Sequence, residues 1–243
     1  MSLLSRAAAI VGAFDDRDPV LSLVELSRRT GLPKSTVHRI VGELVTLRVL
    51  ERHDDGYRLG MWLFERGELV PGHRSLSEAA LPVMEDLREA TRQRIHLAVL
   101  DGVDVVYVEI LGTGGLEVVS RTGGRLPAHA TGVGKAMLAY SPAATVQARI
   151  EAGLPRLTPR TISTSGGLVR ELRKIRSVGM ALDLEEAQLG VSCVAAPVFG
   201  ADRKVAAGLS VTGVTGSVDP GTLGPAVRTA AFTLSRLLRE SGL

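Results

Sequence analysis

The chain has 243 residues, of which 45% are hydrophobic and 23% are charged, and its formal net charge at pH 7 is +3. This length suits two domains, and the composition is close to the average for globular proteins. The single cysteine, Cys193, excludes an internal disulfide, and no apolar run reaches membrane-spanning length or resembles a secretion signal. The five histidines have no metal-ligand spacing. We therefore expect a cytoplasmic protein with no membrane partner, metal or cofactor.

The N-terminal region has the pattern of three short helices. Residues 3–14 have apolar side chains at helical spacing, and an acidic stretch with a proline ends the pattern. Ser22 is expected to cap a second helix, with Glu25 completing a capping box. Gly31 suits the left-handed residue that ends this helix, and Pro33 suits the first turn of a third. The third helix is expected to bury Val37, Ile40, Val41 and Leu44.

The second and third helices, within residues 21–44, are typical of a helix-turn-helix that binds DNA. Near the start of the third helix the outward side chains are hydroxyls and cations. Hydroxyls can hydrogen-bond with bases or phosphates, and arginine can bind guanine bidentately. We expect contacts with bases from Ser35, Thr36 and Arg39, and contacts with the DNA backbone from Lys34, His38, Arg28 and Arg29.

Positive charge is concentrated in a short stretch of a neutral region. Residues 1–65 contain nine Lys or Arg and nine Asp or Glu, yet between Leu26 and Gly42 there are four cations and no acid. A basic stripe of this kind is typical of a surface that follows a phosphate backbone.

A β-hairpin is predicted directly after the third helix. Its strands are Val49–Arg52 and Tyr57–Leu59, around a turn at residues 54–56. Three helices followed by a hairpin form a winged helix-turn-helix, which is a more specific pattern than two helices alone. Arg52 and Arg58 are placed to reach phosphates from this wing.

A linker helix is predicted at Met61–Val70, and Pro71–Gly72 marks a boundary. We therefore divide the chain into a winged helix-turn-helix domain at 1–60, a linker helix at 61–72 and a larger domain at 73–243. Trp62 and Phe64 could pack on the wing or join the linkers of a dimer. We favour the dimer contact, because two-fold DNA readers need one.

The larger domain mixes strands and helices in the pattern of an α+β fold. Strands are predicted at 95–100, 103–110, 116–120, 193–199 and 205–212. Helices are predicted at 77–91, 143–152, 168–178 and 223–239.

Four segments resemble the IclR family of bacterial transcriptional regulators. They are LSLVELSRRTGLPKSTVHRIV at 21–41, YRLG at 57–60, LPAHATGVGKAMLAY at 126–140 and VGMALDLEEAQLGVSCVAAPVF at 178–199. The resemblance implies a winged helix-turn-helix domain, a linker helix and a C-terminal GAF-like effector domain with a curved antiparallel sheet flanked by helices. It also implies homodimers that often pair into homotetramers, a double-stranded DNA operator, and control by a small organic effector, commonly a carboxylic acid. The family contains repressors and activators.

The resemblance places an effector pocket between the concave sheet and the loop before the helix that contains Gly134 and Lys135. The N–H groups of Gly132 and Val133 could hold a carboxylate there. His129 stands beside the same loop and could bond an acid, although a structural role is favoured. Wall residues from 114–120 are left unassigned. The remaining positions that match the family's pocket are Leu126, Asp183, Val191, Cys193, Ser210 and Thr212.

Other chemistry is less well supported. The TGVGKA segment lacks both the glycine and the Ser or Thr of a phosphate-binding loop, since His129 and Ala136 occupy those positions. Cys193 lies in an apolar strand, which favours a wall or core role over reactivity. Adjacent carboxylates without a nucleophile or metal are weak support for an enzyme. The favoured hypothesis is a ligand-responsive DNA-binding transcription factor. The alternative is a small-molecule sensor or enzyme whose winged helix mediates protein–protein contacts.

Overall fold

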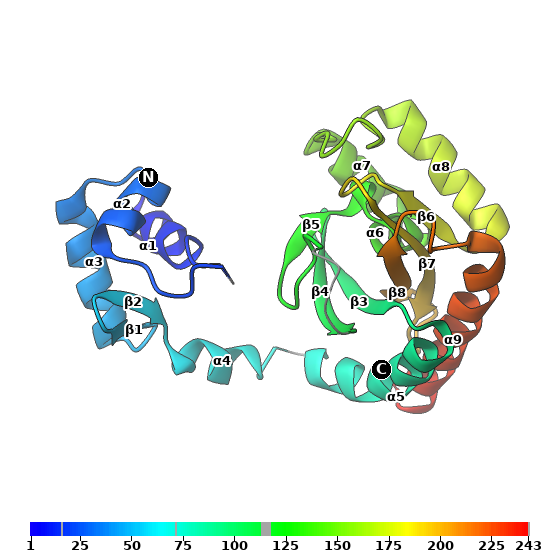
Figure 1. Ribbon diagram of the computed structural model, residues 1–243, viewed down its shortest axis with the longest axis horizontal. Helices are drawn as coiled ribbons and strands as arrows, with labels where there is room; N and C mark the ends of the chain where they lie inside the picture. The colour runs from blue at the N-terminus through cyan, green and yellow to red at the C-terminus, as the bar shows by residue number, and fades with distance from the viewer. Residues whose placement is uncertain (16, 71, 113–117, 243) are drawn as a thin grey trace. The chain divides into compact units, whose positions relative to one another are not determined.

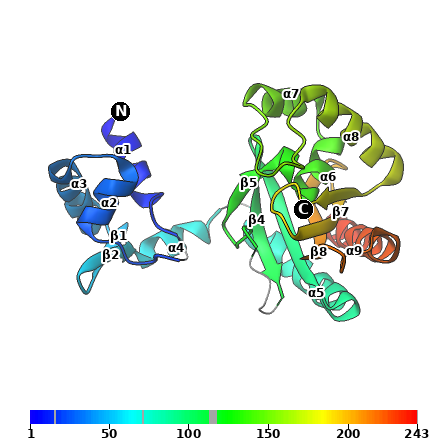
Figure 2. The same cartoon turned by 45° about the horizontal axis from the view of Figure 1, so that its top comes forward.

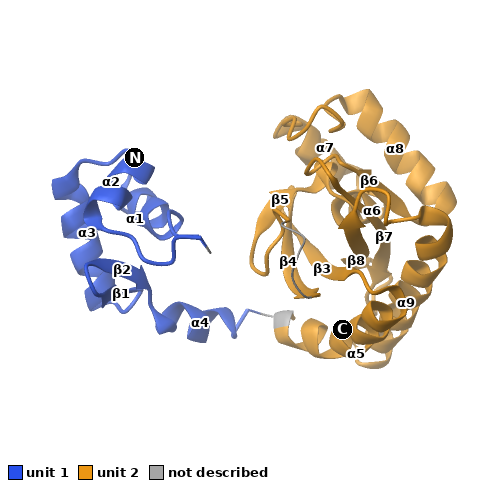
Figure 3. Cartoon of the chain, viewed as in Figure 1, with its two compact units in different colours: residues 1–71 blue, residues 72–243 orange. Residues whose placement is uncertain are grey.

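The computed structural model describes residues 1–15, 17–70, 72–112 and 118–242. The chain forms two compact units, unit 1 at residues 1–71 and unit 2 at residues 72–243 (Figure 3). Within the described ranges, no helix combines the length and apolar character needed to cross a membrane.

Unit 1 contains a three-helix core and a two-stranded wing (Figure 1). Ser2 and Ser22 cap the first two helices, and Gly31 ends the second in the left-handed conformation with φ of 67°. The four apolar residues expected inside the third helix are all buried. The elements are α1 Leu3–Val11, α2 Leu23–Thr30, α3 Lys34–Thr46, β1 Leu50–His53, β2 Gly56–Leu59 and α4 Met61–Gly67.

The wing is an antiparallel hairpin that is tied back to the helices. Leu50 pairs with Leu59 and Glu51 pairs with Arg58, in a register that leaves Asp54 in the turn. A bridge between Leu21 and Tyr57 joins the wing to the segment before α2. This bridge holds the hairpin beside the helix-turn-helix.

Local details of unit 1 differ from the sequence-based expectations. Glu25 does not complete a capping box, because its carboxylate accepts hydrogen bonds from Arg28 and Arg29. Pro33 is the N-cap of α3 and not a residue of its first turn. The linker helix is shorter than predicted: α4 ends at Gly67, a residue of poor helix propensity.

Unit 2 is built on one six-stranded antiparallel sheet with the order β5-β4-β3-β8-β7-β6. Helices α5 and α9 pack on one face, and α6 and α8 contribute to the core on the other (Figure 2). The strands are β3 Arg94–Asp101, β4 Asp104–Leu111, β5 Arg125–Pro127, β6 Ala181–Leu184, β7 Val191–Phe199 and β8 Val205–Val214. The helices are α5 His73–Thr91, a 3-10 turn Ala128–Ala130, α6 Gly132–Tyr140, α7 Ala143–Glu151, α8 Ser165–Val178 and α9 Pro220–Glu240.

Side-chain alternation along the strands separates the two faces. Ile95 and Leu97 of β3 pack in the core with α5 and α9, whereas Ala98 packs in the core with α6. His96 therefore points to the α6 face. The same alternation places Ser210 of β8 and Cys193 of β7 on that face, beside α6.

Three expectations for unit 2 need correction. Residues 116 and 117 of the strand predicted at 116–120 lie outside the described residues, and residues 118–120 are not a strand. The short strand β6 was not predicted. Helix α5 begins at His73 and contains Pro82 in its interior. Burial of the apolar face around Ala80 and Met84 offsets the hydrogen bond that Pro82 cannot donate.

Candidate functional site

The start of α6 lies directly on the sheet because its glycines permit it. A Cβ atom on Gly132 would overlap Cys193 Sγ, and one on Gly134 would overlap the backbone of Ala128. Thr131 caps the helix by accepting a hydrogen bond from the Gly134 N–H at 3.0 Å. The glycines of TGVGK thus serve close packing, which brings the positive end of the α6 dipole to the concave face of the sheet.

Below this helix end, polar side chains form a row across four neighbouring strands. The register pairs His96 with Ser210, Thr212 with Cys193, and Cys193 with Asp183. The His96 Nδ1 and Thr212 Oγ1 atoms are 3.2 Å apart. All five side chains are buried. A row of buried polar groups in an apolar interior is costly unless something bonds with it.

A small cavity lies between this polar row and α6, with about 30 Å³ of free volume. Eight of the nine residues predicted for the effector pocket line it, namely Leu126, Gly132, Val133, Asp183, Val191, Cys193, Ser210 and Thr212. Val118, Val119 and Ser120 also line it, and they belong to the 114–120 segment whose wall residues were left unassigned. Sequence reasoning missed the other lining residues, which are His96, Tyr107, Thr131, Ala187 and Gln188. Their positions follow from strand register and loop packing, which the sequence pattern did not resolve.

His129 is the predicted residue that does not line the cavity. Its buried ring donates from Nε2 to the Pro155 carbonyl oxygen at 3.1 Å. The 3-10 turn Ala128–Ala130 places the ring toward the loop between α7 and α8. His129 is therefore not part of the candidate effector site. Its position beside the loop in the sequence does not bring its side chain to the cavity.

Asp183 is the acid of the cavity wall. Its Oδ1 accepts a hydrogen bond from the Glu186 N–H at 2.7 Å. Burial raises the pKa of this carboxyl from 3.8 to about 7, although Lys135 and the backbone N–H groups oppose the shift. Asp183 therefore exchanges a proton near neutral pH and can donate as well as accept a hydrogen bond.

The other titratable groups that line the cavity are neutral at pH 7. Burial lowers the pKa of His96 to about 3. Burial also raises the pKa values of the Tyr107 hydroxyl and the Cys193 thiol well above their usual range. The thiol is thus a poor nucleophile. Among the described residues that line the cavity there is no Lys or Arg.

A buried ion pair anchors the cavity from outside its wall. Lys135 of α6 is fully buried and donates to Glu186 Oε1 in the loop after β6. The Glu186 backbone carbonyl accepts from the Thr161 hydroxyl at 2.6 Å. Burial raises the pKa of Glu186, against the opposing effect of Lys135. The pair fixes the Asp183–Glu186 loop to α6, and the Thr161 hydrogen bond fixes it to the segment before α8.

In unit 1, the start of α3 presents the residues predicted to read DNA. Lys34, Ser35, His38 and Arg39 are exposed, and Thr36 is half-buried. Arg39 also donates to Glu43 Oε1 at 2.8 Å, one turn further along the helix. In the wing, Arg52 lies over the Tyr57 ring, and Arg58 donates to Glu51.

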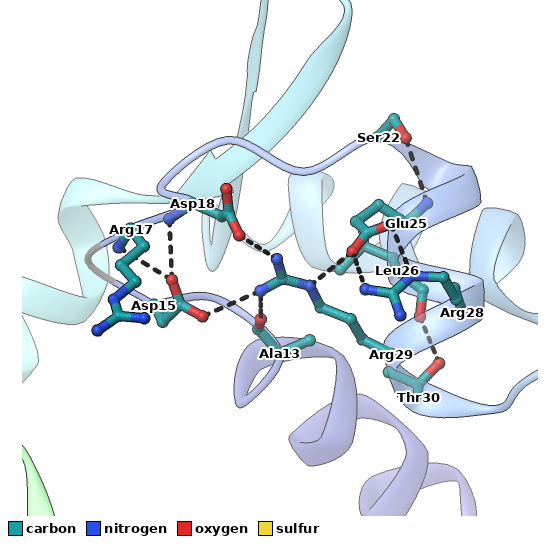
Figure 4. Close-up of polar contacts among 10 residues, drawn as sticks. All are labelled: Ala13, Asp15, Arg17, Asp18, Ser22, Glu25, Leu26, Arg28, Arg29 and Thr30. Carbon is teal, nitrogen blue, oxygen red and sulfur yellow. Dashed lines mark hydrogen bonds and ion pairs between the residues drawn. The ribbon is translucent and has the colours of Figure 1, made fainter.

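Arg28 and Arg29 differ although they are adjacent (Figure 4). Arg28 is exposed and, among the described residues, forms a two-point contact with Glu25 alone, at 3.0 and 2.6 Å. Arg29 has only 19% of its side chain exposed and donates to Glu25, Asp15, Asp18 and the Ala13 carbonyl (Figure 4). Arg29 thus ties α2 to the loop after α1, and the structure gives it a structural role that the basic stripe did not suggest.

A winged helix-turn-helix unit followed by an α+β unit with an internal polar cavity defines a class, the DNA-binding regulators of transcription. The family models agree with this class. Residues 3–54 match the IclR helix-turn-helix domain, and residues 70–236 match the model described as bacterial transcriptional regulator IclR C-terminal. The chain belongs to the IclR family of transcriptional regulators.

Individual relatives match nearly the whole chain. The chain is 35% identical to the HTH-type transcriptional regulator XynR of Escherichia coli (strain K12) over 242 residues, which is 97% of this chain and 96% of that protein. An IclR homologue from Microbacterium hydrocarbonoxydans, solved in complex with 4-hydroxybenzoate, matches with a TM-score of 0.86 and 29% identity, covering 98% of this chain and 100% of that one. The Thermotoga maritima IclR structure matches with a TM-score of 0.76 and 27% identity, covering 97% and 98%.

Proposed function

We propose that this regulator binds a small organic acid in the cavity between α6 and the sheet, and that this binding controls its affinity for a DNA operator. The observation that supports the proposal most strongly is the buried polar row beneath the α6 N-terminus. Ser210 Oγ and His96 Nε2 are buried there and have no hydrogen-bond partner among the described residues. Such groups need a hydrogen-bonding partner to offset their desolvation, and the polar groups of a bound acid would supply one.

The cavity wall favours an acid that also has a hydroxyl or another hydrogen-bond donor. Because no cation lines the described wall, a carboxylate would be held by neutral donors and by the positive end of α6. Protonated Asp183 would add a donor, and ionised Asp183 would accept from a ligand hydroxyl. The relative solved with 4-hydroxybenzoate holds a ligand with both kinds of group.

Entry of such an acid requires the wall to open. About 30 Å³ accommodates one or two water molecules and not an aromatic ring. One contact that closes the wall is the hydrogen bond from the Val119 N–H to Gln188 Oε1, at 2.8 Å. We expect effector binding to displace this contact and to bias the two units between states of different DNA affinity.

On DNA, α3 is proposed to enter the major groove. Ser35, Thr36 and Arg39 would contact bases, and Lys34 and His38 would contact phosphates. Arg28, Arg52 and Arg58 would add backbone contacts. Arg29 is not included, because its donors already have partners within unit 1.

A homodimer would present two such helices to successive grooves. Leu4 of α1 and Met61 and Phe64 of α4 are exposed to 81%, 60% and 63%. Exposed apolar side chains of this size favour a protein contact, and we propose that they join two copies of the chain. Trp62 would support the contact from within α4, where Arg66 lies over its ring.

The DNA arm of the test is selection from a random-sequence duplex pool by the purified protein. A regulator enriches one sequence, called here the selected duplex, and binds it more tightly than a shuffled duplex of the same composition. A protein whose winged helix mediates only protein contacts enriches none.

The effector arm is a thermal-shift screen of small hydroxylated and aromatic acids, with 4-hydroxybenzoate among them. A stabilising acid should then change the affinity for the selected duplex. Ser210→Ala should weaken this response and leave effector-free DNA binding intact. Ser192→Ala, the same change in β7 at a residue that does not line the cavity, is the control. Equal acid responses in both variants would show that the acid binds elsewhere.

A further inference from the structure

Three arginines of the proposed DNA surface are each held by a carboxylate of the same unit. Arg28 contacts Glu25 at 2.6 Å, Arg39 contacts Glu43 at 2.8 Å, and Arg58 contacts Glu51 at 3.1 Å. The arginine side chains remain 71%, 57% and 50% exposed. The cations are therefore accessible to a DNA backbone, yet each already has an anion beside it.

Regular secondary structure builds in these pairings. Glu25 and Arg28 are three residues apart on α2, and Arg39 and Glu43 are four apart on α3, the two spacings that bring helical side chains together. Glu51 and Arg58 are directly opposite each other in the wing hairpin. Each acid is thus placed beside its arginine by helix or hairpin geometry and not by a chance rotamer.

We propose that these glutamates act as internal substitutes for phosphate, so that unit 1 binds arbitrary DNA weakly and keeps its affinity for the operator. The proposal rests on the DNA surface proposed above. A phosphate that approaches Arg28 or Arg58 must replace a carboxylate, which exchanges one anion for another. Fewer bound counterions are then released from DNA, and counterion release is the main source of sequence-independent affinity.

The Arg39–Glu43 pair explains why affinity for the operator should be reduced less than affinity for arbitrary DNA. On arbitrary DNA its guanidinium can stay with Glu43, because a phosphate offers no better geometry than a carboxylate. On the operator a correctly placed guanine offers two hydrogen bonds in a fixed direction. Only the right base therefore separates Arg39 from Glu43, and the pair acts as a specificity filter.

Other cations of the surface remain available for the first encounter. Lys34, at the start of α3, has no ion-pair partner among the residues that the structure describes. Arg52 contacts only the Tyr57 ring there. These two cations provide phosphate attraction that no glutamate opposes directly.

Glu43 is the acid whose removal tests the proposal most directly. Glu25 also holds Arg29, and Glu51 Oε1 also accepts the Met61 N–H at the start of α4, so changes there would alter the fold locally. Within the described part of the chain, the Glu43 side chain contacts only Arg39. Glu43→Gln keeps the shape of the side chain and removes its charge.

Glu240→Gln is the matched control. Arg236 and Glu240 form the same i, i+4 pair on α9 of unit 2, with side chains 59% and 60% exposed, against 57% and 52% for Arg39 and Glu43. Both variants change the net charge by the same amount. A difference between them therefore reports the position of the acid and not the total charge.

The experiment measures affinity for the selected and the shuffled duplex across a series of salt concentrations, for the wild-type chain and both variants. We expect Glu43→Gln to steepen the salt dependence on the shuffled duplex by up to about 0.9 in log–log slope, the value for one more neutralised phosphate. Near ~0.1 M salt this slope corresponds to at most about eightfold tighter binding. The selected duplex should gain less, so the ratio of the two affinities should fall.

Three results would overturn the proposal: an unchanged slope on the shuffled duplex, equal effects of Glu43→Gln and Glu240→Gln, or an equal gain on both duplexes. Failure of the proposed function looks different. In that case the random pool yields no selected duplex for the wild-type chain, and an arbitrary duplex taken from the unselected pool still shows whether Glu43 restrains sequence-independent binding.

Discussion

The ion pairs of the proposed DNA surface in unit 1 and the ion pair beside the cavity in unit 2 differ in exposure. In unit 1, Arg28, Arg39 and Arg58 of the proposed DNA surface are exposed, and each is paired with a glutamate that solvent also reaches. In unit 2 the pair beside the cavity, Lys135 with Glu186, is buried under α6. An ion pair between a basic side chain and a glutamate is therefore a surface feature in the first case and part of the interior in the second.

The difference in exposure determines what each pair can do. An exposed pair contributes little to stability, so an incoming ligand can replace one partner at low cost. A buried pair is expensive to separate, because the remaining ion stays desolvated. We infer that unit 1 exchanges its ionic partners when DNA binds, whereas unit 2 uses its ion pair to hold the α6 N-terminus and the Asp183–Glu186 loop around the cavity.

The largest expected effect comes from breaking the buried pair. Lys135→Met removes the cation and leaves Glu186 without its partner, which should lower the free energy of unfolding of unit 2 by about 3–5 kcal/mol. Urea unfolding followed by circular dichroism measures this loss. The only tryptophan, Trp62, lies in unit 1. The unfolding transition that Trp62 fluorescence reports should therefore differ little between Lys135→Met and the wild type.

The double variant Lys135→Met, Glu186→Leu is the control for that experiment. Replacing both partners with apolar side chains should recover much of the lost stability, since no unpaired charge remains buried. A loss below about 1 kcal/mol in the single variant would contradict the contrast between the two units, because breaking a buried pair costs several times more.

The second prediction concerns the buried acid beside that pair. The folded-state pKa of Asp183 is about 7, above its ordinary value of 3.8, so the folded chain keeps a proton that the unfolded chain releases. The stability of unit 2 should therefore decrease as the pH rises from about 4 to about 7. Asp183→Asn cannot ionise, and its advantage over the wild type should grow by on the order of 2 kcal/mol between pH 5 and pH 8.

Unfolding curves at these two pH values test this expectation. Asp104→Asn is a useful comparison, because Asp104 is only partly buried and is paired with Arg149. If Asp183→Asn and the wild type respond equally to pH, the proton of Asp183 is not held as the cavity geometry indicates.

The third prediction returns to unit 1. Arg39→Ala should weaken binding of the selected duplex by about 1–3 kcal/mol, the usual value of a bidentate arginine–guanine contact. The shuffled duplex should be affected much less, because Glu43 already satisfies Arg39 there. Gel-shift titrations with both duplexes measure the two effects, and an equal loss on both would make Arg39 a backbone contact.

The sequence predicted the DNA-binding unit well because its folding signals are local. Ser22 caps α2, Gly31 adopts the left-handed conformation, and the wing follows at the expected place. The role of Arg29 could not be predicted in the same way. Its partners Asp15 and Asp18 lie 14 and 11 residues earlier, and counting charges within the basic stripe says nothing about such contacts.

The cavity was predicted in part, and only through the family resemblance. The positions that match the family's motifs line it, but His96 and Tyr107 reach it through the register of β3, β4 and β8. That register includes a bulge between Leu97 and Ala98, which no local pattern indicates. His129 was misplaced for the opposite reason, since proximity in sequence was taken for proximity to the cavity.

The smallest expected effects come from the neighbouring arginines of α2, which contrast the two uses of charge within one helix. Arg28→Ala should leave the unfolding midpoint of unit 1 unchanged, because its only ion-pair partner among the described residues is an accessible glutamate. It should reduce the salt slope on both duplexes by less than about 1, the usual value for one phosphate contact, because Glu25 already shields Arg28. Arg29→Ala should instead lower the unfolding midpoint reported by Trp62 fluorescence, since Asp15, Asp18 and Glu25 then lose a shared partner. If the two variants lowered stability equally, the exposure of an arginine in unit 1 would not tell whether its ion pair stabilises the fold or is available to DNA.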